Sequence, residues 1–179
     1  MRMHFPLIVF FCMFISILAS SHAGNSSFGW GVVNMQGAII ETACAIAVES
    51  QDQSIDMEVI PMSVILRDGE GKVKNFSIEL VNCVFEHQDD TKPDWKQFQI
   101  TFDGDAEGDF FSVQGEASGV ALKITDKSGN LALPGQPFSR EDIIQDEMKL
   151  NYQLRLVANH SSLKAGNFSS AIRFKLDYF

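Results

Sequence analysis

The sequence predicts an all-β protein, a single antiparallel sandwich of short strands, and three observations support that class. Apolar residues recur at every second position in almost every apolar cluster, as in strands that bury one face. Turn-forming runs such as RDGEGK, DKSGN and LPGQP separate the clusters at short intervals. Helical periodicity is scarce. Many short alternating segments divided by turns are typical of antiparallel sandwiches.

Six clusters supply the expected strands, and in each the alternate residues share one face. The inward-facing sets are Ile55, Met57 and Val59; Phe76, Ile78 and Leu80; Phe98, Ile100 and Phe102; Val120, Leu122 and Ile124; Met148, Leu150, Tyr152, Leu154 and Leu156; and Phe168, Ser170, Ile172, Phe174, Leu176 and Tyr178. A helix of one or two turns is expected only over residues 139–149, where Ser139 is a candidate cap and Glu141 and Asp142 favour a helix N-terminus.

Residues 1–23 have the layout of a secretory signal peptide. Arg2 precedes an apolar run from Phe5 to Ala19, and Ser21 and Ala23 are small residues around a cleavage site. A membrane anchor is the alternative, but the run is shorter than the ~20 residues that a spanning helix needs. We therefore expect export with cleavage after Ala23, and a mature chain long enough for one domain with its own core.

Composition and cysteine usage narrow the function classes. The chain is acidic, with a formal net charge of −9, and it has no basic patch with interleaved aromatic residues, so nucleic acid is not an expected partner. Cys12 lies in the expected signal peptide, which leaves Cys44 and Cys83. An oxidising compartment favours a disulfide between these two, and neither has a second Cys or His at metal-ligand spacing.

The segment DGDAEGDFFSVQ, from Asp103 to Gln114, resembles a calcium-binding loop. Asp103, Asp105 and Glu107 alternate, but the final ligand position holds the neutral amide of Gln114 and both flanks are strand-like. A solvated acidic hairpin is the better interpretation, so no metal and no cofactor is expected.

Catalytic motifs are not found in the sequence. After the signal peptide the chain has two histidines, His87 and His160, both in polar stretches. His87 lies near Asp89 and Asp90, but this polar cluster is more typical of a solvated turn than of a catalytic His–Asp dyad. The sequence has no nucleophile elbow and no phosphate-binding glycine loop. We therefore expect neither an enzyme nor a small-molecule substrate.

The stretch that follows the signal peptide is apolar although it lies near a terminus. Phe28, Trp30 and Val32 alternate on one face, and Gly29, Gly31, Val33 and Met35 on the other. Apolar side chains on such a terminal segment predict that it binds a partner.

Several segments together resemble the pilin subunits of Gram-negative fimbriae that are assembled by the chaperone–usher route, most of all the minor subunits of type 1, P and S fimbriae. They are MQGAIIETACA and IELVNCVF around the two cysteines, ITFDG, GVALKITDKSGN, and the terminal LKAGNFSSAIRFKLDY. The terminal segment is the most specific, because Gly166 precedes the near-terminal Tyr178 by about a dozen residues, joined by alternating apolar residues. The likeness covers the whole mature chain.

The resemblance implies an incomplete immunoglobulin-like sandwich that lacks its seventh strand and is completed by donor-strand complementation. Residues 36–179 would form the pilin domain and residues 24–35 the donor-strand extension. The groove edge would be formed by Phe168, Ser170, Ile172, Phe174, Leu176, Tyr178 and Phe179, and the donor strand by Phe28, Trp30, Gly31, Val33 and Met35.

Partners and location follow from the same resemblance. A periplasmic chaperone would pair with residues 168–178 and anchor the carboxylate of Phe179, and at the outer-membrane usher a neighbouring subunit's extension would replace it. The chain would thus be exported through the periplasm to a cell-surface fimbrium that supports adhesion. We expect a minor structural subunit, with the base of the fibre as one position. The alternatives are a major shaft pilin and a free-standing secreted β-sandwich that binds calcium or sugar.

Overall fold

The computed structural model describes residues 31–37, 39, 41–144 and 148–179, and the chain divides into two units, residues 1–39 and 40–179. In the first unit the described residues form neither helix nor strand, and Val32, Val33, Met35 and Ile39 are almost fully exposed. The expected signal peptide, and Phe28 and Trp30 of the expected donor strand, lie outside the described residues.

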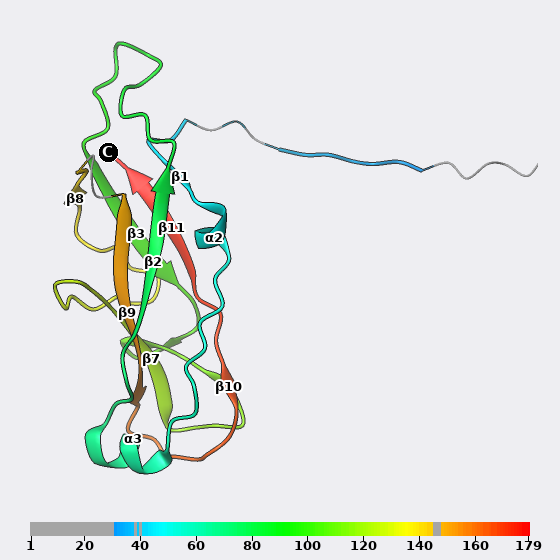
Figure 1. Cartoon of the computed structure of the whole chain (residues 1–179), viewed down its shortest axis with the longest axis vertical. Helices are drawn as coiled ribbons and strands as arrows, with labels where there is room; N and C mark the ends of the chain where they lie inside the picture. Colours follow the sequence, from blue (N-terminus) through cyan, green and yellow to red (C-terminus); the bar gives the residue numbers. More distant parts are fainter. Residues whose placement is uncertain (1–30, 38, 40, 145–147) are drawn as a thin grey trace, which may run out of the picture. The chain divides into compact units, whose positions relative to one another are not determined.

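The second unit contains a six-stranded antiparallel sheet with the strand order β1-β2-β9-β7-β5-β4 (Figure 1). The strands are β1 (Ala45–Ile46), β2 (Lys74–Val81), β9 (Lys149–Ala158), β7 (Val120–Asp126), β5 (Phe110–Phe111) and β4 (Ala106–Glu107). The long strands β2, β7 and β9 are those that the period-two pattern predicts, so that part of the prediction is confirmed.

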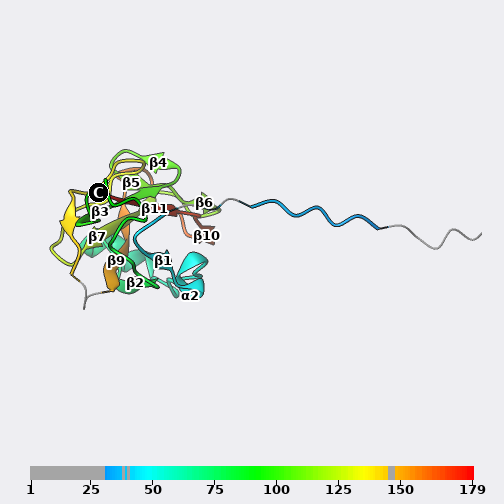
Figure 2. The ribbon, with the colours of Figure 1, turned by 90° about the horizontal axis from the view of Figure 1, so that it is seen from above.

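A second antiparallel sheet has the order β11-β3-β8, formed by Arg173–Tyr178, Gln97–Asp103 and Glu141–Asp142. A two-stranded ribbon pairs β10 (Phe168–Ser169) with β6 (Gln114–Gly115). Figure 2 shows β3 and β11 on one side of the unit and β2 and β9 on the other, as expected for a sandwich. The all-β antiparallel prediction is therefore confirmed.

The core fills the space between the two sheets. Phe102 of β3 packs edge-on against Tyr152 of β9, with ring centroids 5.0 Å apart, and against Phe76 of β2 at 6.1 Å. Phe102, Phe111 and Ile78 are the largest fully buried side chains. Inward-facing residues from both sheets thus meet in one apolar layer, which is the main source of stability in a fold of this kind.

Two short helices, α2 (Val48–Gln51) and α3 (Met62–Asp68), were not expected from the sequence. Helix α3 buries Ile65 and ends at Gly69, whose φ of 74° suits glycine and whose N–H donates to the carbonyl of Ile65. Among the residues that the structure describes, no helix is long and apolar enough to span a bilayer.

The helix predicted over residues 139–149 is wrong where the structure describes it. Glu141 and Asp142 form β8, which pairs with the start of β3, and the side-chain amide of Gln97 donates to Asp142 at 2.9 Å. The edge of β3 offers main-chain partners to this segment, and pairing with a neighbouring strand overrides a weak local helix signal.

Two details of the predicted strands also differ. Glu58 has a φ of 60°, which reverses the alternation of residues 55–59, so Val59 is 95% exposed and Ile60 packs on the core in its place. The terminal segment forms β10 and β11 and not one continuous strand. Between them Ser170 is exposed, and its hydroxyl donates to the carbonyl of Ser112.

Candidate assembly groove

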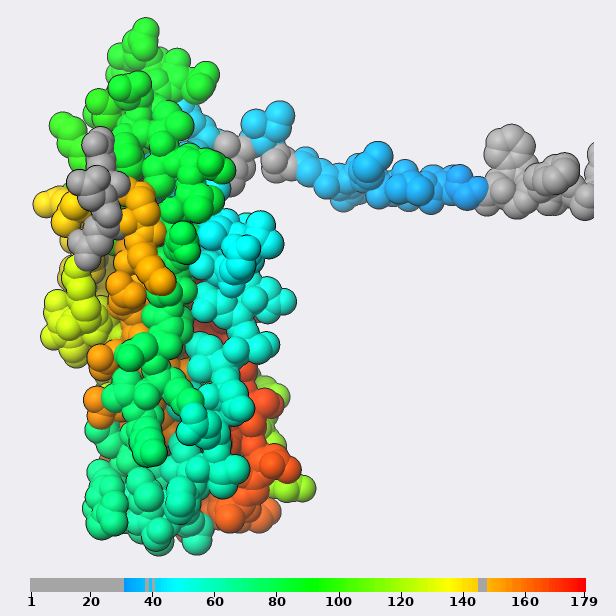
Figure 3. Space-filling view, in the orientation of Figure 1, coloured from blue at the N-terminus to red at the C-terminus, as the bar shows by residue number. Residues whose placement is uncertain are grey.

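A groove of about 970 Å³ runs between two segments that are far apart in the sequence. One wall consists of Ile46 and residues 50–60, and the other of residues 166–170 and 172–174. Figures 1 and 3 show these segments in cyan and red, lying side by side along the unit. Its floor is made of core side chains, namely Phe76, Phe102, Leu122, Ile124 and Leu154. The groove therefore opens onto the hydrophobic core itself.

The first wall has unpaired main-chain groups. Within the described part of the chain, no main-chain N–H or carbonyl of residues 53–60 bonds to another main-chain group. Ile55, Met57 and Ile60 are half-buried and pack on the core, which holds the segment in place through side chains alone. Such a segment has the hydrogen-bonding groups of a strand without a partner strand.

The second wall is an edge strand. Residues 173–178 of β11 pair with residues 98–103 of β3, and in the described chain the other side of β11 has no partner. The inward-facing residues of this segment are only half-buried, namely Phe168, Ile172, Phe174, Leu176 and Tyr178. Apolar side chains and an unpaired strand edge together form a surface that favours strand addition.

Gly166 lets the start of the second wall approach the loop before β7. A Cβ atom on Gly166 would lie 2.6 Å from Cβ of Glu116 and 2.7 Å from the main-chain nitrogen of Ala117. Contacts this short do not occur between real side chains, so only glycine fits here. The glycine that the sequence pattern singled out thus has a packing role at the end of the groove.

The last residue is held by main-chain bonds on the β3 side. The main-chain oxygen of Phe179 accepts hydrogen bonds from the N–H groups of Lys96 (2.8 Å) and Gln97 (3.0 Å), and the N–H of Phe179 donates to the carbonyl of Gln97. The guanidinium of Arg140 lies 3.6 Å from the centroid of the Phe179 ring, a cation–π arrangement. These contacts tie residue 179 to the start of β3 and to Arg140.

The expected disulfide between Cys44 and Cys83 is confirmed, with the Cα atoms 4.1 Å apart. It joins the residue before β1 to the end of β2, where Ala45 already pairs with Val81. The bridge therefore fixes the point at which the chain enters the larger sheet, next to the first wall of the groove.

The acidic hairpin is also confirmed, since β4 pairs with β5 around Gly108, whose φ is 62°. Three of its carboxylates have different partners: Asp103 pairs with Arg173 at 3.0 Å, Asp105 accepts from Gln114 at 3.0 Å, and Glu107 accepts from Asn159. In the described residues, no three His, Cys, Asp or Glu side chains are grouped so that they could hold a metal ion.

In the described residues His87 forms no hydrogen bond or ion pair with Asp89 or Asp90. Its ring packs on Trp95 at 4.0 Å, and Nδ1 lies 3.3 Å from Oε1 of Glu41. Glu41 also accepts from the N–H of Gln88, and this bond is the main reason that the pKa of Glu41 lies below its ordinary value. Only 8% of the surface of the His87 side chain is exposed. Its contacts with Trp95 and Glu41 therefore stabilise the loop that contains His87, and they leave no open site for a substrate.

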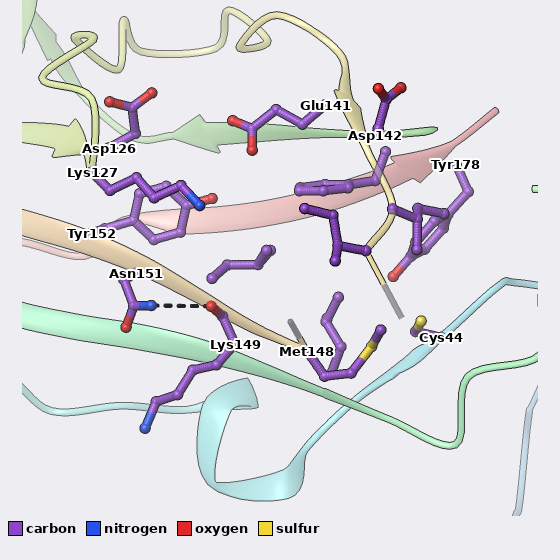
Figure 4. A pocket seen from close by; sticks show the side chains of 15 residues that line it. Cys44, Asp126, Lys127, Glu141, Asp142, Met148, Lys149, Asn151, Tyr152 and Tyr178 are labelled. Atoms are coloured by element: carbon purple, nitrogen blue, oxygen red, sulfur yellow. Dashed lines mark hydrogen bonds between the residues drawn. The ribbon is translucent and has the colours of Figure 1, made fainter. Parts of the chain in front are cut away.

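A second, smaller pocket of about 70 Å³ lies between β8 and the start of β9 (Figure 4). Tyr178, Tyr152 and Met148 line it, and Glu141 and Asp142 stand at its rim. Pockets that enclose a drug-sized ligand measure about 300–1,000 Å³, so this one is too small for such a molecule. The large groove is therefore the candidate site.

The described residues of the expected donor strand are Gly31, Val33 and Met35. Val33 is 82% exposed and Met35 is 88% exposed. Both side chains are therefore open to contact by a partner.

The fold and the groove define an immunoglobulin-like sandwich in which, over the described residues, the groove side of β11 has no partner strand. The sequence is 30% identical to the PRS and PAP fimbrial minor pilin proteins of Escherichia coli, across 99% of this chain and the whole of each relative. It is also 30% identical to the Fimbria A protein of Serratia marcescens, across 93% of this chain and 96% of that protein. The chain therefore belongs to the chaperone–usher fimbrial pilin family.

Solved structures agree with this fold. The P pilus rod subunit superposes with a TM-score of 0.67 at 22% identity, covering 77% of this chain and all of that one. A chaperone–usher pilus structure, reported for rod uncoiling, superposes with a TM-score of 0.65 at 23% identity and covers 85% of this chain and 97% of the other. No family model matches the sequence. The relatives are structural pilins, in agreement with a protein that is not an enzyme.

Proposed function

We propose that this chain is a minor structural subunit of the surface fimbrium of a Gram-negative bacterium, assembled through donor-strand exchange. The groove that opens onto the core is the observation that carries this proposal. Its two walls hold rows of unpaired main-chain groups, and its floor is apolar. A strand inserted between the walls would bond to both and place alternate side chains in the core, which is how strand addition achieves affinity and specificity.

The first occupant is the strand of a periplasmic chaperone. It pairs with the open edge formed by residues 168–178, and it captures the C-terminal carboxylate of Phe179. The main-chain oxygen of Phe179 accepts from the N–H groups of Lys96 and Gln97. At the outer-membrane usher, the extension of a neighbouring subunit replaces the chaperone strand.

The chain's own extension, residues 24–35, inserts in the same way into the groove of a neighbouring subunit. Gly31, Val33 and Met35 form the face that enters the neighbour's groove, and the bulky Phe28 and Trp30 select one particular neighbour. The exposure of Val33 and Met35 supports this role. The names of the two full-length relatives from Escherichia coli support a minor subunit over a major shaft pilin.

Expression of the mature chain with and without its chaperone tests the groove model. A subunit whose core is completed by another chain is expected to aggregate or be degraded alone, because its folding is linked to association. It should be recovered as a soluble one-to-one complex when the chaperone is present. A soluble monomer with a cooperative melt in the absence of any partner would show a free-standing module and overturn the proposal.

Strand exchange on the purified complex then tests the position in the fibre. Excess donor peptide from a shaft subunit is added and release of the chaperone is followed. Release identifies an internal subunit whose groove accepts a neighbour. Stable capture without release identifies the subunit at the base of the fibre, which donates its extension and accepts none.

A further inference from the structure

Carboxylates gather along the first wall of the groove. Asp52, Asp56 and Glu58 all line it, and all three are exposed. Glu58 is paired with the ammonium group of Lys74. Within the described chain the carboxylate of Asp52 has no hydrogen bond or ion pair, and the carboxylate of Asp56 accepts only from the N–H of Glu58 at 2.8 Å. Two of the three charges therefore have no cationic partner.

The opposite wall does not balance these charges. Its only cationic residue is Arg173, which is engaged by Asp103 at 3.0 Å. The other groove-lining residues of that wall, 166–170, 172 and 174, are uncharged. A strand that enters the groove therefore meets an acidic rim on one side and a neutral one on the other.

The backbone places this rim beside the outer face of any inserted strand. In an extended chain alternate residues share a face, and over residues 54–57 the burial alternates in this way: Ile55 and Met57 pack on the core while Asp56 is exposed. Asp52, four residues before Asp56, is exposed as well. An inserted strand turns its alternate residues inward and outward in the same way. Its outward side chains then become cross-strand neighbours of the two aspartates, and opposite charges in that relation are favourable.

The chain's own extension does not supply such charges, because no side chain from Gly24 to Ile40 is ionisable. We propose that the groove selects a strand of another chain that carries lysine or arginine at the outward positions facing Asp52 and Asp56. This inference rests on the proposed function. It adds that the protein's own uncharged extension gains nothing from the acidic rim, so that copies of the chain add to one another less readily than a lysine-bearing strand adds to the groove.

Refolding with peptides measures this selectivity directly. The mature chain, with its disulfide intact, is unfolded in denaturant and diluted into increasing concentrations of peptide, and the peptide concentration that gives half of the maximal soluble subunit is determined. Two peptides share one alternating apolar face and differ only at two outward positions, which hold either lysine or glutamine. A third peptide has the sequence of residues 24–35.

The lysine peptide should need a concentration about 2- to 30-fold lower than the glutamine peptide, since two opposite-charge pairs contribute about 0.4–2 kcal/mol together. The advantage should shrink between about 0.05 M and about 0.5 M salt, because salt screens exposed charges. The peptide of residues 24–35 should rescue no better than the glutamine peptide.

Matched variants separate local contacts from general attraction to an acidic protein. The double variant D52N/D56N should lose the preference for lysine, while E49Q/D90N, with the same change in net charge at exposed sites outside the groove, should keep it. Equal rescue by both peptides, survival of the preference in D52N/D56N, or rescue by the chain's own extension at the lysine peptide's concentration would each overturn the inference. Failure of every peptide to rescue would instead count against the proposed function.

Discussion

Phe174 of β11 lies directly opposite Phe102 of β3, with the two ring centroids 6.3 Å apart. Phe102 is 2% exposed and belongs to the core, whereas Phe174 is half-buried and lines the groove. The pair joins the open edge of the sandwich to its interior. A strand inserted in the groove is therefore expected to extend the same apolar layer that holds the two sheets together.

Replacement of Phe174 by serine should abolish capture by the chaperone. Removing a fully buried phenylalanine costs about 3–5 kcal/mol, and the half-buried Phe174 should contribute roughly half of that to the wall on which an inserted strand packs. Co-purification of tagged chaperone with the subunit measures the effect, and little or no Phe174→Ser subunit should be recovered.

Lys175→Ser is the matched control for this experiment. Lys175 is the next residue of β11, lies on the exposed face and pairs with Asp177 at 2.9 Å. Exposed ion pairs of this kind contribute about 0–1 kcal/mol, so capture should be nearly normal. Normal capture of Phe174→Ser would show that the groove is not the chaperone site.

The long strands could be predicted because apolar and polar residues alternate along them, and this alternation is what buries one face of each strand. Ile78, Ile100, Leu122 and Leu154 lie in the core as the period-two pattern indicates. The C-terminal wall of the groove follows from the same pattern, since Phe174 belongs to an alternating run. Sequence reasoning thus predicted the apolar residues of this wall, and their role in assembly stays a prediction.

The other half was missed for physical reasons. Residues 53–60 have alternating character, but nothing local shows that their main chain has no partner, since hydrogen bonding between distant segments is a tertiary property. The reversal at Glu58 depends on a left-handed backbone that glutamate rarely adopts. Helix α3 is seven residues long, too short for a period of 3.6 to be recognised.

The disulfide should be a main source of stability. In the chain-entropy account, a bridge between residues 39 positions apart stabilises the fold by about 4 kcal/mol. Cys44→Ser should therefore lower both the yield of chaperone complex and the melting temperature of the peptide-bound subunit. Cys83→Ser and the double variant should behave alike, because each removes the same bond. Unchanged melting of Cys44→Ser would contradict a stabilising role.

Gly166→Ala should destabilise the end of the groove. The added methyl group would meet Glu116 and the main chain of Ala117 at less than 3 Å, and overpacking of this kind costs about 1–3 kcal/mol. Thermal unfolding of the peptide-bound subunit is the measurement. Gly37→Ala is the comparison, since a Cβ there has nothing within 4 Å and should leave the melting temperature unchanged. Equal melting temperatures of the two variants would show that the loop between β6 and β7 moves to accommodate the added methyl group without loss of stability.

The two tyrosines should titrate late in the folded subunit. Burial raises the pKa of Tyr178 from 10.0 to about 12, and burial, together with nearby Glu141 and Asp126, raises the pKa of Tyr152 as well. Since the fold favours the neutral phenol, this contribution to stability is complete below pH 10 and is lost as the pH rises through about 12.

Phenolate absorbance in the near ultraviolet, recorded on subunit bound to a tyrosine-free peptide, should stay low at pH 10 and rise together with unfolding. The denatured chain should titrate near the ordinary value of 10. Half-ionised tyrosine at pH 10 in the folded subunit would mean that water reaches both rings, so that the inserted strand does not close the sandwich around them.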